Sequence, residues 1–172
     1  MAFLTDLEFI KDYITGKKVP VVGSEFNRQE VEQYLVEGLG WEKSDVEVDR
    51  KVAFTAAGEP WSSKVDLVVS LKGVPVMLIK CAAGSLGSRE KEAVSAARIA
   101  CELPIALSVV SDGKTAIVLN TLTGKKVAEG LRAIPTPKQA AKLAVPTEPL
   151  AEKNLERARI VFRSYDSMNI NR

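Results

Sequence analysis

The sequence predicts an α/β fold in which helices cover both faces of a central mixed sheet. Two short apolar runs with the composition of strands, residues 65–71 and 74–79, are separated by the turn signal Lys72-Gly73. Segments whose apolar residues follow helical spacing lie before and after these runs. Strands joined through a helix at 88–102, with hairpins at both ends, indicate a three-layer α/β/α core. We expect further helices at the N- and C-terminal ends.

Three elements are predicted before the first of these two runs. Apolar residues at helical spacing predict a helix over residues 5–14: Leu7, Ile10 and Ile14. A second helix is predicted over residues 27–39, where Glu32 borders a buried stripe formed by Val31, Leu35 and Leu39. The alternating run 46–54 predicts a half-exposed strand with these apolar residues on one side: Val46, Val48, Val52 and Phe54.

The second half of the chain continues the alternation of helix and strand. The helix at 88–102 is expected to take Ser88 as its N-cap, and strands at 105–110 and 115–119 flank the turn Asp112-Gly113. A short helix at 137–143, a proline-rich linker at 145–149 and a helix at 151–165 follow. These elements predict three parts: an N-terminal helix in residues 1–20, a core domain in residues 21–144, and a linker with a C-terminal helix in residues 145–172.

One acid stands out because it lies inside a run that is otherwise built for burial. Asp66 needs a partner there, since an unpaired carboxylate is costly away from water. Lys80 ends the next run, fourteen residues later. A three-residue loop, 71–73, would place Asp66 opposite Leu78 and diagonal to Lys80 on one face, whereas a two-residue loop would put Lys80 on the other face. We expect the three-residue loop, because it lets the lone acid meet the lone base.

Composition excludes several kinds of protein. The 172 residues suit one compact domain, and no run approaches the length of a membrane span. The chain has no histidine, which removes the usual general base and most zinc sites. It has 24 Lys and Arg against 22 Asp and Glu, far from a strongly basic footprint. Two cysteines and the lack of a signal peptide lead us to expect a cytoplasmic protein with reduced thiols.

The pattern around Asp66 resembles a known family. An Asp on one strand, a hairpin, and a second strand that ends in an acid-x-Lys triplet is the signature of the PD-(D/E)XK nuclease fold. The sequence of residues 65–79 resembles the N-terminal domain of type I restriction enzyme R subunits. The resemblance extends from Gly40-Trp41 to Ser111-Asp112-Gly113. It implies a restriction-endonuclease-like core and a nuclease site that uses Mg²⁺.

The catalytic motif of that family is degenerate here. Lys80 stands where the family has Glu, and Ala82 stands where it has the catalytic Lys. A glutamine and a tyrosine common in the next helix would fall on Glu92 and Ala96. Asp66 alone survives of the metal-and-lysine set. We therefore expect the Lys80 ammonium to replace the metal ion and cleavage to be impaired.

Two other interpretations remain open. The catalytic groups could have migrated, with Lys80 positioning the water and Glu32, Asp66 and Glu92 forming an acidic cluster that binds Mg²⁺, with Asp66 and Glu32 as its ligands. The chain could also be a non-enzymatic scaffold that binds a protein partner or forms a homodimer. On the final helix, Arg157, Arg159 and Arg163 are predicted to face outward, either as a solvated face or as contacts to DNA phosphates.

Overall fold

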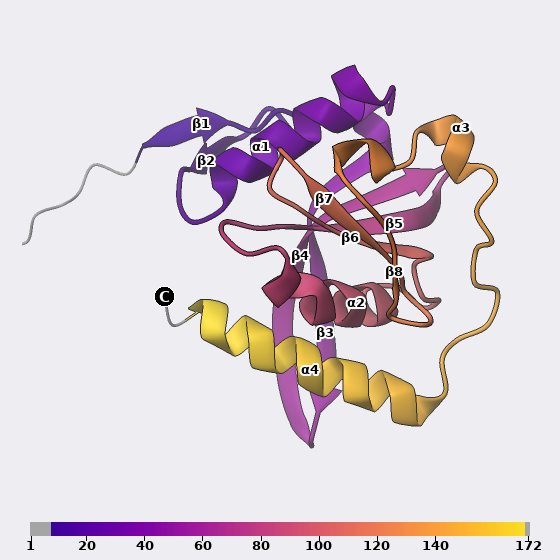
Figure 1. The fold of residues 1–172 in the computed structure, drawn as a ribbon. Helices are drawn as coiled ribbons and strands as arrows, with labels where there is room; N and C mark the ends of the chain where they lie inside the picture. Colours follow the sequence, from indigo (N-terminus) through magenta and orange to yellow (C-terminus); the bar gives the residue numbers. More distant parts are fainter. Residues whose placement is uncertain (1–7, 171–172) are drawn as a thin grey trace, which may run out of the picture.

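The computed structural model describes residues 8–170, and these form a six-stranded mixed sheet with helices on both faces (Figure 1). The strands lie in sequence order: β3 (Val46–Ala56), β4 (Glu59–Leu71), β5 (Val74–Cys81), β6 (Leu107–Ser111), β7 (Ala116–Asn120) and β8 (Lys126–Glu129). β5 and β6 are parallel and are joined through a helix, whereas all other neighbours are antiparallel. The predicted α/β/α architecture with a mixed sheet is confirmed.

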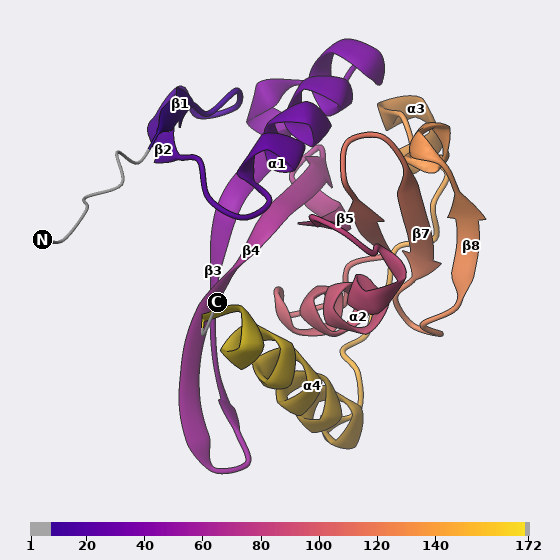
Figure 2. The same ribbon diagram turned by 60° about the vertical axis from the view of Figure 1, so that its left-hand side comes forward.

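The helices form the two outer layers. They are α1 (Glu25–Gln33), which continues as a π-helical turn (Tyr34–Gly38), α2 (Glu90–Ile99), the short α3 (Pro137–Ala140) and α4 (Glu152–Ile170). Figures 1 and 2 show α1 on one side of the sheet and α2 with α4 on the other. Among the described residues, no helix combines the length and apolar composition needed to cross a membrane.

Two apolar cores lie between these layers. Under α1, Leu35 and Trp41 pack with Leu67 of β4 and Ile79 of β5, and the Trp41 indole N–H donates to the carbonyl of Pro135 at 3.0 Å. On the other face, alanines of α2 pack closely on Val68 and Leu78. Phe162 of α4 joins this second core and meets Phe54 edge to face, with ring centroids 5.9 Å apart. The second face is therefore covered by two stacked helices.

The connection between β4 and β5 differs from the prediction. Leu71 pairs with Val74, so the loop has two residues, Lys72 and Gly73, both with positive φ (51° and 81°). The predicted three-residue loop is therefore wrong. A β-bulge has the same effect as the third loop residue that had been predicted. Ser70 pairs with Pro75 but Val69 pairs with Met77, which leaves Val76 unpaired. Leu67 then pairs with Ile79, and Asp66 falls beside Lys80 on the same face.

The sequence predicted that the apolar residues of β3 share one side of the strand, but in the structure they do not. Val46 and Val48 pack in the core under α1, whereas Val52 and Phe54 pack in the core under α2 and α4. The change falls at Asp49, whose φ of 54° breaks the extended backbone and which pairs with no residue of β4. Beyond this point β3 and β4 form a long ribbon that projects past the rest of the sheet, alongside α4 (Figure 2).

The predicted N-terminal helix is wrong for the residues that the structure describes; Leu7 lies outside them. A two-stranded hairpin occupies this segment, formed by β1 (Phe9–Lys11) and β2 (Lys18–Pro20). Turn chemistry overrides the apolar spacing, because the Asp12 carboxylate accepts hydrogen bonds from both the backbone N–H and the hydroxyl of Thr15 at 2.8 Å. Gly16 supplies the positive φ that closes the turn.

Two smaller expectations also fail. Ser88 is not the N-cap of α2, since it lies in a 3₁₀ turn (Gly87–Arg89) and its hydroxyl donates to the carbonyl of Ser85. Strand β8 had not been predicted at all. Its four residues are largely exposed, so they carry no buried apolar alternation from which a strand could be inferred.

Candidate functional site at Lys80

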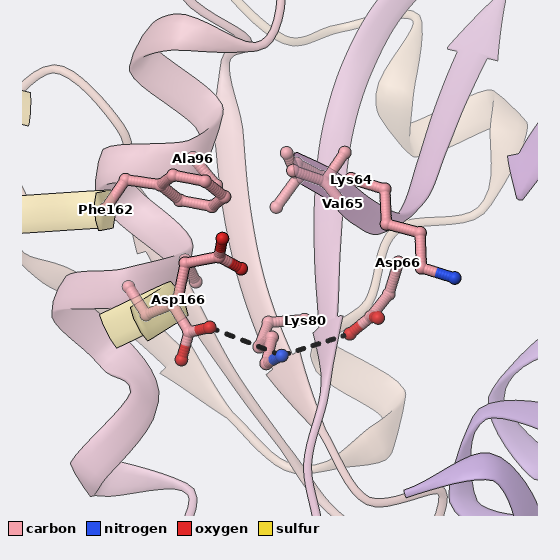
Figure 3. Close-up of a pocket in the computed structure, with 10 residues that line it drawn as sticks. Lys64, Val65, Asp66, Lys80, Ala96, Phe162 and Asp166 are labelled. Carbon is pink, nitrogen blue, oxygen red and sulfur yellow. Dashed lines mark ion pairs between the residues drawn. The ribbon is translucent and has the colours of Figure 1, made fainter. Parts of the chain in front are cut away.

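The sheet brings Asp66 of β4 and Lys80 of β5 together at the face covered by α2. The Lys80 Nζ lies 3.6 Å from Asp66 Oδ2 (Figure 3). It also lies 3.3 Å from Glu92 Oε1 of α2. Asp66 and Lys80 are adjacent because of the bulge in β5, and Glu92 is in reach because it lies in the first turn of the crossover helix α2. The ammonium therefore lies between two carboxylates.

The charges at this position compensate one another. Burial alone would lower the pKa of Lys80, but the charges of Asp66 and Glu92 outweigh it and raise that pKa above its ordinary value. Asp66 has a second role, because its Oδ2 accepts a hydrogen bond from the backbone N–H of Cys81 at 2.8 Å. The Lys80 side chain keeps 22% of its surface exposed, so the cluster borders solvent.

Two residues that sequence reasoning missed complete this group. Arg89 donates to Glu92 Oε2 at 3.1 Å, and the Asn169 amide of α4 donates to Glu92 Oε1 at 3.1 Å. Arg89 also donates to the side-chain oxygen of Asn169 at 3.2 Å. The spacing of Arg89 and Glu92 on one helical turn was a usable signal, whereas Asn169 lies beyond the predicted end of its helix. We call these five residues the Lys80 cluster: Asp66, Lys80, Arg89, Glu92 and Asn169.

The residues of the Lys80 cluster do not fit a Mg²⁺ ion. Mg²⁺ requires octahedral oxygen ligands and keeps several of its waters, but here the two carboxylates share an ammonium and already accept other hydrogen bonds. The cavity beside Lys80 has a volume of only about 30 Å³, enough for one or two waters. Within residues 8–170, no group of three or more acidic or cysteine side chains is arranged to hold a metal ion.

A larger hollow opens next to the Lys80 cluster. Its volume is about 470 Å³, and three cations line it: Lys64, Lys80 and Arg89. Asn169 and the loop before α1, at Gly23 and Ser24, complete the wall, and no carboxylate is among the lining residues. We call this the basic hollow. Each of its three cations also contacts a carboxylate that does not line the hollow.

Glu32 does not join the Lys80 cluster, which contradicts the predicted cluster of Glu32, Asp66 and Glu92. It points from α1 toward Arg28, whose Nε lies 3.8 Å from Glu32 Oε1. Arg28 also contacts Glu25 at 2.6 Å, Asp49 at 2.8 Å and Asp12 at 3.7 Å. We call these five residues the Arg28 cluster. Glu32 was predicted at the border of the buried stripe, but its side chain is fully buried because the N-terminal hairpin covers it.

The pKa of Glu32 reflects this position. Burial raises the pKa to about 8, and the neighbouring Asp12 adds to the rise, while Arg28 works against it. Neither oxygen of the Glu32 carboxyl group has a hydrogen-bond donor among the described residues. A proton on Glu32 resolves this, since a neutral acid costs far less to bury than a carboxylate. These surroundings therefore favour the neutral form of Glu32.

The three arginines proposed as phosphate contacts on α4 have different surroundings. Arg159 forms ion pairs with Glu152 at 2.6 Å and Glu156 at 3.6 Å. Arg163 donates to the carbonyl of Ala56 at 2.7 Å and so ties α4 to the tip of the ribbon. Arg157 is exposed, and no ion pair within the described residues includes it. Arg157 alone of the three is left available for an external anion.

Comparison with solved structures supports the fold. The chain is similar to a fragment of a protein described as an HsdR subunit of a type I restriction enzyme from Vibrio vulnificus YJ016, with a TM-score of 0.52 and 14% sequence identity. The similarity covers 70% of this chain but 25% of that one, so this chain spans about a quarter of its relative. No curated protein sequence matches this chain.

Comparison with protein families identifies the sequence itself. The family described as type I restriction enzyme R protein N terminus matches residues 23–135. The match includes every strand of the main sheet and every member of the Lys80 cluster except Asn169. It confirms the resemblance inferred from Asp66 and the hairpin that follows it. This chain belongs to the family of type I restriction enzyme R protein N termini.

Proposed function

We propose that this domain is a non-cleaving relative of restriction R-subunit nuclease domains that associates with nucleic acid. The observation that carries the proposal is the Lys80 ammonium, which lies between Asp66 and Glu92 at 3.6 and 3.3 Å. The family resemblance implies a metal ion at this place. A fixed protein cation neutralises the carboxylates there instead, so the site keeps its charge balance without the ion.

The magnitude of this interaction supports replacement of the metal. Two unit charges about 4 Å apart attract by on the order of 4 kcal/mol at an effective dielectric of about 20, before desolvation is subtracted. Lys80 has two such partners, and both carboxylates are held by further donors. A divalent ion entering the site would have to displace an ammonium that is covalently attached to the sheet.

The basic hollow supports an association with nucleic acid. Lys64, Lys80 and Arg89 line one cavity without a carboxylate among the lining residues. Lys64 keeps 66% of its side chain exposed beside its ion pair with Asp49 at 3.6 Å, so it can also meet an external phosphate. Phosphate groups bind to such clusters and release counterions, which makes affinity depend on salt. The hollow lies directly beside the degenerate motif, where the nuclease resemblance implies that the backbone of a nucleic acid would pass.

Cleavage of supercoiled plasmid in Mg²⁺ or Mn²⁺ tests the first part of the proposal. We expect no nicked or linear product above a protein-free control. Metal-dependent cleavage that disappears in both Asp66→Asn and Glu92→Gln would instead establish the alternative, an active Mg²⁺-dependent endonuclease with migrated residues. That result would overturn the non-cleaving assignment.

Binding of a short DNA duplex and of the corresponding single strand, measured by fluorescence anisotropy across a salt series, tests the second part. The Lys64→Gln/Arg89→Gln variant should bind more weakly and reduce the salt slope by about one to two. Lys153→Gln is a matched control, because Lys153 is an exposed cation on α4 outside the hollow. Salt-independent or absent binding by the unmodified chain would favour the scaffold alternative.

Restoring the family motif offers a direct test of the site. The Lys80→Glu/Ala82→Lys variant should bind Mn²⁺ in a calorimetric titration, whereas the unmodified chain should not. Adding Asp66→Asn to this variant should abolish the restored binding, which ties it to the predicted ligands. If the double variant folds but binds no Mn²⁺, the site is not a nuclease site altered at these two positions.

A further inference from the structure

A second groove lies on the other side of α2 from the Lys80 cluster. Glu92 and Ala96 line the small cavity at Lys80, whereas Lys91, Val94 and Arg98 line a groove between α2, the N-terminal half of α4 and the turn after β7. Its volume is about 360 Å³. It shares no lining residue with the basic hollow. We call it the α2–α4 groove.

Three cations line the α2–α4 groove, and they are not compensated. Lys91, Arg98 and Arg157 all face it, yet no ion pair within residues 8–170 includes any of them. Glu90 is the one carboxylate among the lining residues, and it lies beyond ion-pair distance of all three. The groove therefore carries two uncompensated positive charges. Most other buried or half-buried cations of this chain have acidic partners, as Arg28, Lys80 and Arg89 do.

Arg98 is the central member of this group. Its Nε donates to the carbonyl of Thr121 at 2.9 Å and its Nη2 to the carbonyl of Leu122 at 3.1 Å, so the turn after β7 holds the guanidinium in place. A guanidinium has five N–H donors, and three of these have no acceptor among the described residues. Burial lowers the pKa of Arg98, and no neighbouring carboxylate opposes that effect. The fixed position and the free donors suit a bound anion with several oxygens.

The rest of the groove is apolar with a few polar groups. Val94 and Ala158 are buried and form its wall together with Val161, while Ser95 and Thr123 contribute hydroxyl groups. An apolar surface beside a cationic end is typical of sites for small ligands, whose volumes begin at about 300 Å³. A plain inorganic ion would leave the apolar wall without a partner.

We propose that the α2–α4 groove binds a small phosphate monoester that carries a flat, largely apolar group, with the size of a mononucleotide. The phosphate oxygens accept from Arg98, Arg157 and Lys91, and the flat group packs on Val94, Ala158 and Val161. A dianionic phosphate matches the two uncompensated charges of the groove. This site is independent of the nucleic-acid association proposed for the basic hollow.

Calorimetric titration with three probes tests the ligand class. Adenosine monophosphate should bind saturably, inorganic phosphate should bind at least about tenfold more weakly, and adenosine should show no saturable binding. Equal affinity for inorganic phosphate and the nucleotide would overturn the role of the apolar wall. No saturable binding of adenosine monophosphate would overturn the proposal as a whole.

Matched variants locate the site. Lys91→Gln/Arg157→Gln removes two exposed cations that make no ion pair within the described residues, so this variant should fold normally. It should bind adenosine monophosphate at least about tenfold more weakly. Lys153→Gln and the basic-hollow variant Lys64→Gln/Arg89→Gln should bind it with unchanged affinity. Unchanged affinity in Lys91→Gln/Arg157→Gln, or lost affinity in Lys64→Gln/Arg89→Gln, would place the nucleotide elsewhere and overturn the assignment. Arg98→Lys provides a second groove variant that keeps the charge while losing the fixed fork of donors, and it too should weaken binding.

Discussion

The Arg28 cluster and the Lys80 cluster both combine cations with carboxyl groups, but they differ in net charge and in access to solvent. Arg28 faces four carboxyl groups and keeps 6% of its side chain exposed, and the N-terminal hairpin covers the group. The Lys80 cluster has two cations for two carboxylates and opens into the basic hollow. The Arg28 cluster has an excess of acid and is closed around its guanidinium, and among the described residues only its member Asp49, with 32% of its side chain exposed, also contacts a cation outside the cluster, Lys64 at 3.6 Å. The Lys80 cluster is neutral and borders a cavity.

The difference separates a structural group from a candidate site. In the Arg28 cluster the raised pKa of Glu32 favours its neutral form, which offsets part of the excess acid. The other three carboxylates contact Arg28, and Asp49 also contacts Lys64 at 3.6 Å. In the Lys80 cluster nothing needs to be protonated, and the cations remain partly accessible to an external ligand. Perturbed pKa values alone would have pointed to Glu32 as the functional residue. Access to a cavity points to Lys80 instead.

The largest expected effect comes from removing the central cation of the closed cluster. Arg28→Met should lower the free energy of unfolding by about 3–5 kcal/mol, because it leaves the buried Asp12 and the largely buried Glu25 without their counter-charge. Urea denaturation followed by circular dichroism measures this. Arg157→Met is the matched control, because Arg157 is exposed and forms no ion pair within residues 8–170. This variant should change the free energy of unfolding by less than about 0.5 kcal/mol. Similar losses in both variants would contradict the structural role of Arg28.

A smaller loss is expected at the open cluster. Asp66→Ala should cost about 2 kcal/mol, because it removes one of the two carboxylates at Lys80 and leaves the buried N–H of Cys81 without its acceptor. The loss stays below the 3–5 kcal/mol or so that is typical of a stranded buried charge, because Glu92 still compensates the ammonium. Asp66→Asn keeps an acceptor for Cys81, so it should cost less than Asp66→Ala in the same denaturation experiment. Equal losses in the two variants would show that the charge, which both remove, dominates over the backbone hydrogen bond.

Glu32→Gln should reveal the proton held by the closed cluster. The pKa of Glu32 is about 8 in the folded chain against 4.5 ordinarily, so the folded state binds this proton more tightly. The resulting stabilisation is complete below about pH 4.5, declines as the pH rises and is gone above about pH 8. Glutamine stays neutral throughout, so at pH 9 the variant should be more stable than the unmodified chain by at least about 1.4 kcal/mol.

The measurement is the difference between the two stability curves from pH 5 to pH 9. Asp12, which faces Glu32 together with Arg28, does not disturb this window. Burial works to raise its pKa, but hydrogen bonds from Gln29 and Thr15 outweigh that effect and lower it, so Asp12 titrates below the window. Curves that stay parallel across these pH values would show that Glu32 is ionised in the folded chain.

The smallest effect is expected at Asn169. Asn169→Ala removes two hydrogen bonds, to Glu92 and from Arg89, but both partners keep their mutual ion pair at 3.1 Å. The free energy of unfolding should fall by about 0.5–1 kcal/mol. A thermal shift of a few degrees measures it, with Ser164→Ala, an exposed position of the same helix outside the cluster, as the control. A loss as large as that of Asp66→Ala would mean that α4 holds the cluster together.

The sequence predicted the core of the site because its signal was local. An acid and a base, each single in its apolar run, had to meet, and the spacing of fourteen residues could bring them together. The route was not predictable, since a two-residue turn with a bulge gives the same facing as a three-residue loop. Arg89 and Glu92 follow from helical spacing, whereas Asn169 depends on the packing of a distant helix.

The closed cluster shows where sequence reasoning stops. Glu25, Arg28 and Glu32 share one helical face, and their spacing alone indicates ion pairs. Asp12 and Asp49 reach them from a tight turn and from a strand residue with positive φ, and neither feature is visible in apolar periodicity. Glu32 therefore seemed to be a helix-edge residue. Its burial follows from a hairpin in a segment where spacing had predicted a helix.

The unpaired Val76 decides which face of the sheet the end of β5 presents. If Val76 paired with Val69 in a regular ladder, every later residue of β5 would move one place along β4, so that Lys80 would lie opposite Val65 and turn to the other face. Deleting Val76 would instead remove the bulge and leave Lys80 opposite Asp66. A chain that keeps all its residues therefore needs the bulge to bring the ammonium to its carboxylates, whereas a chain shortened by this one residue does not.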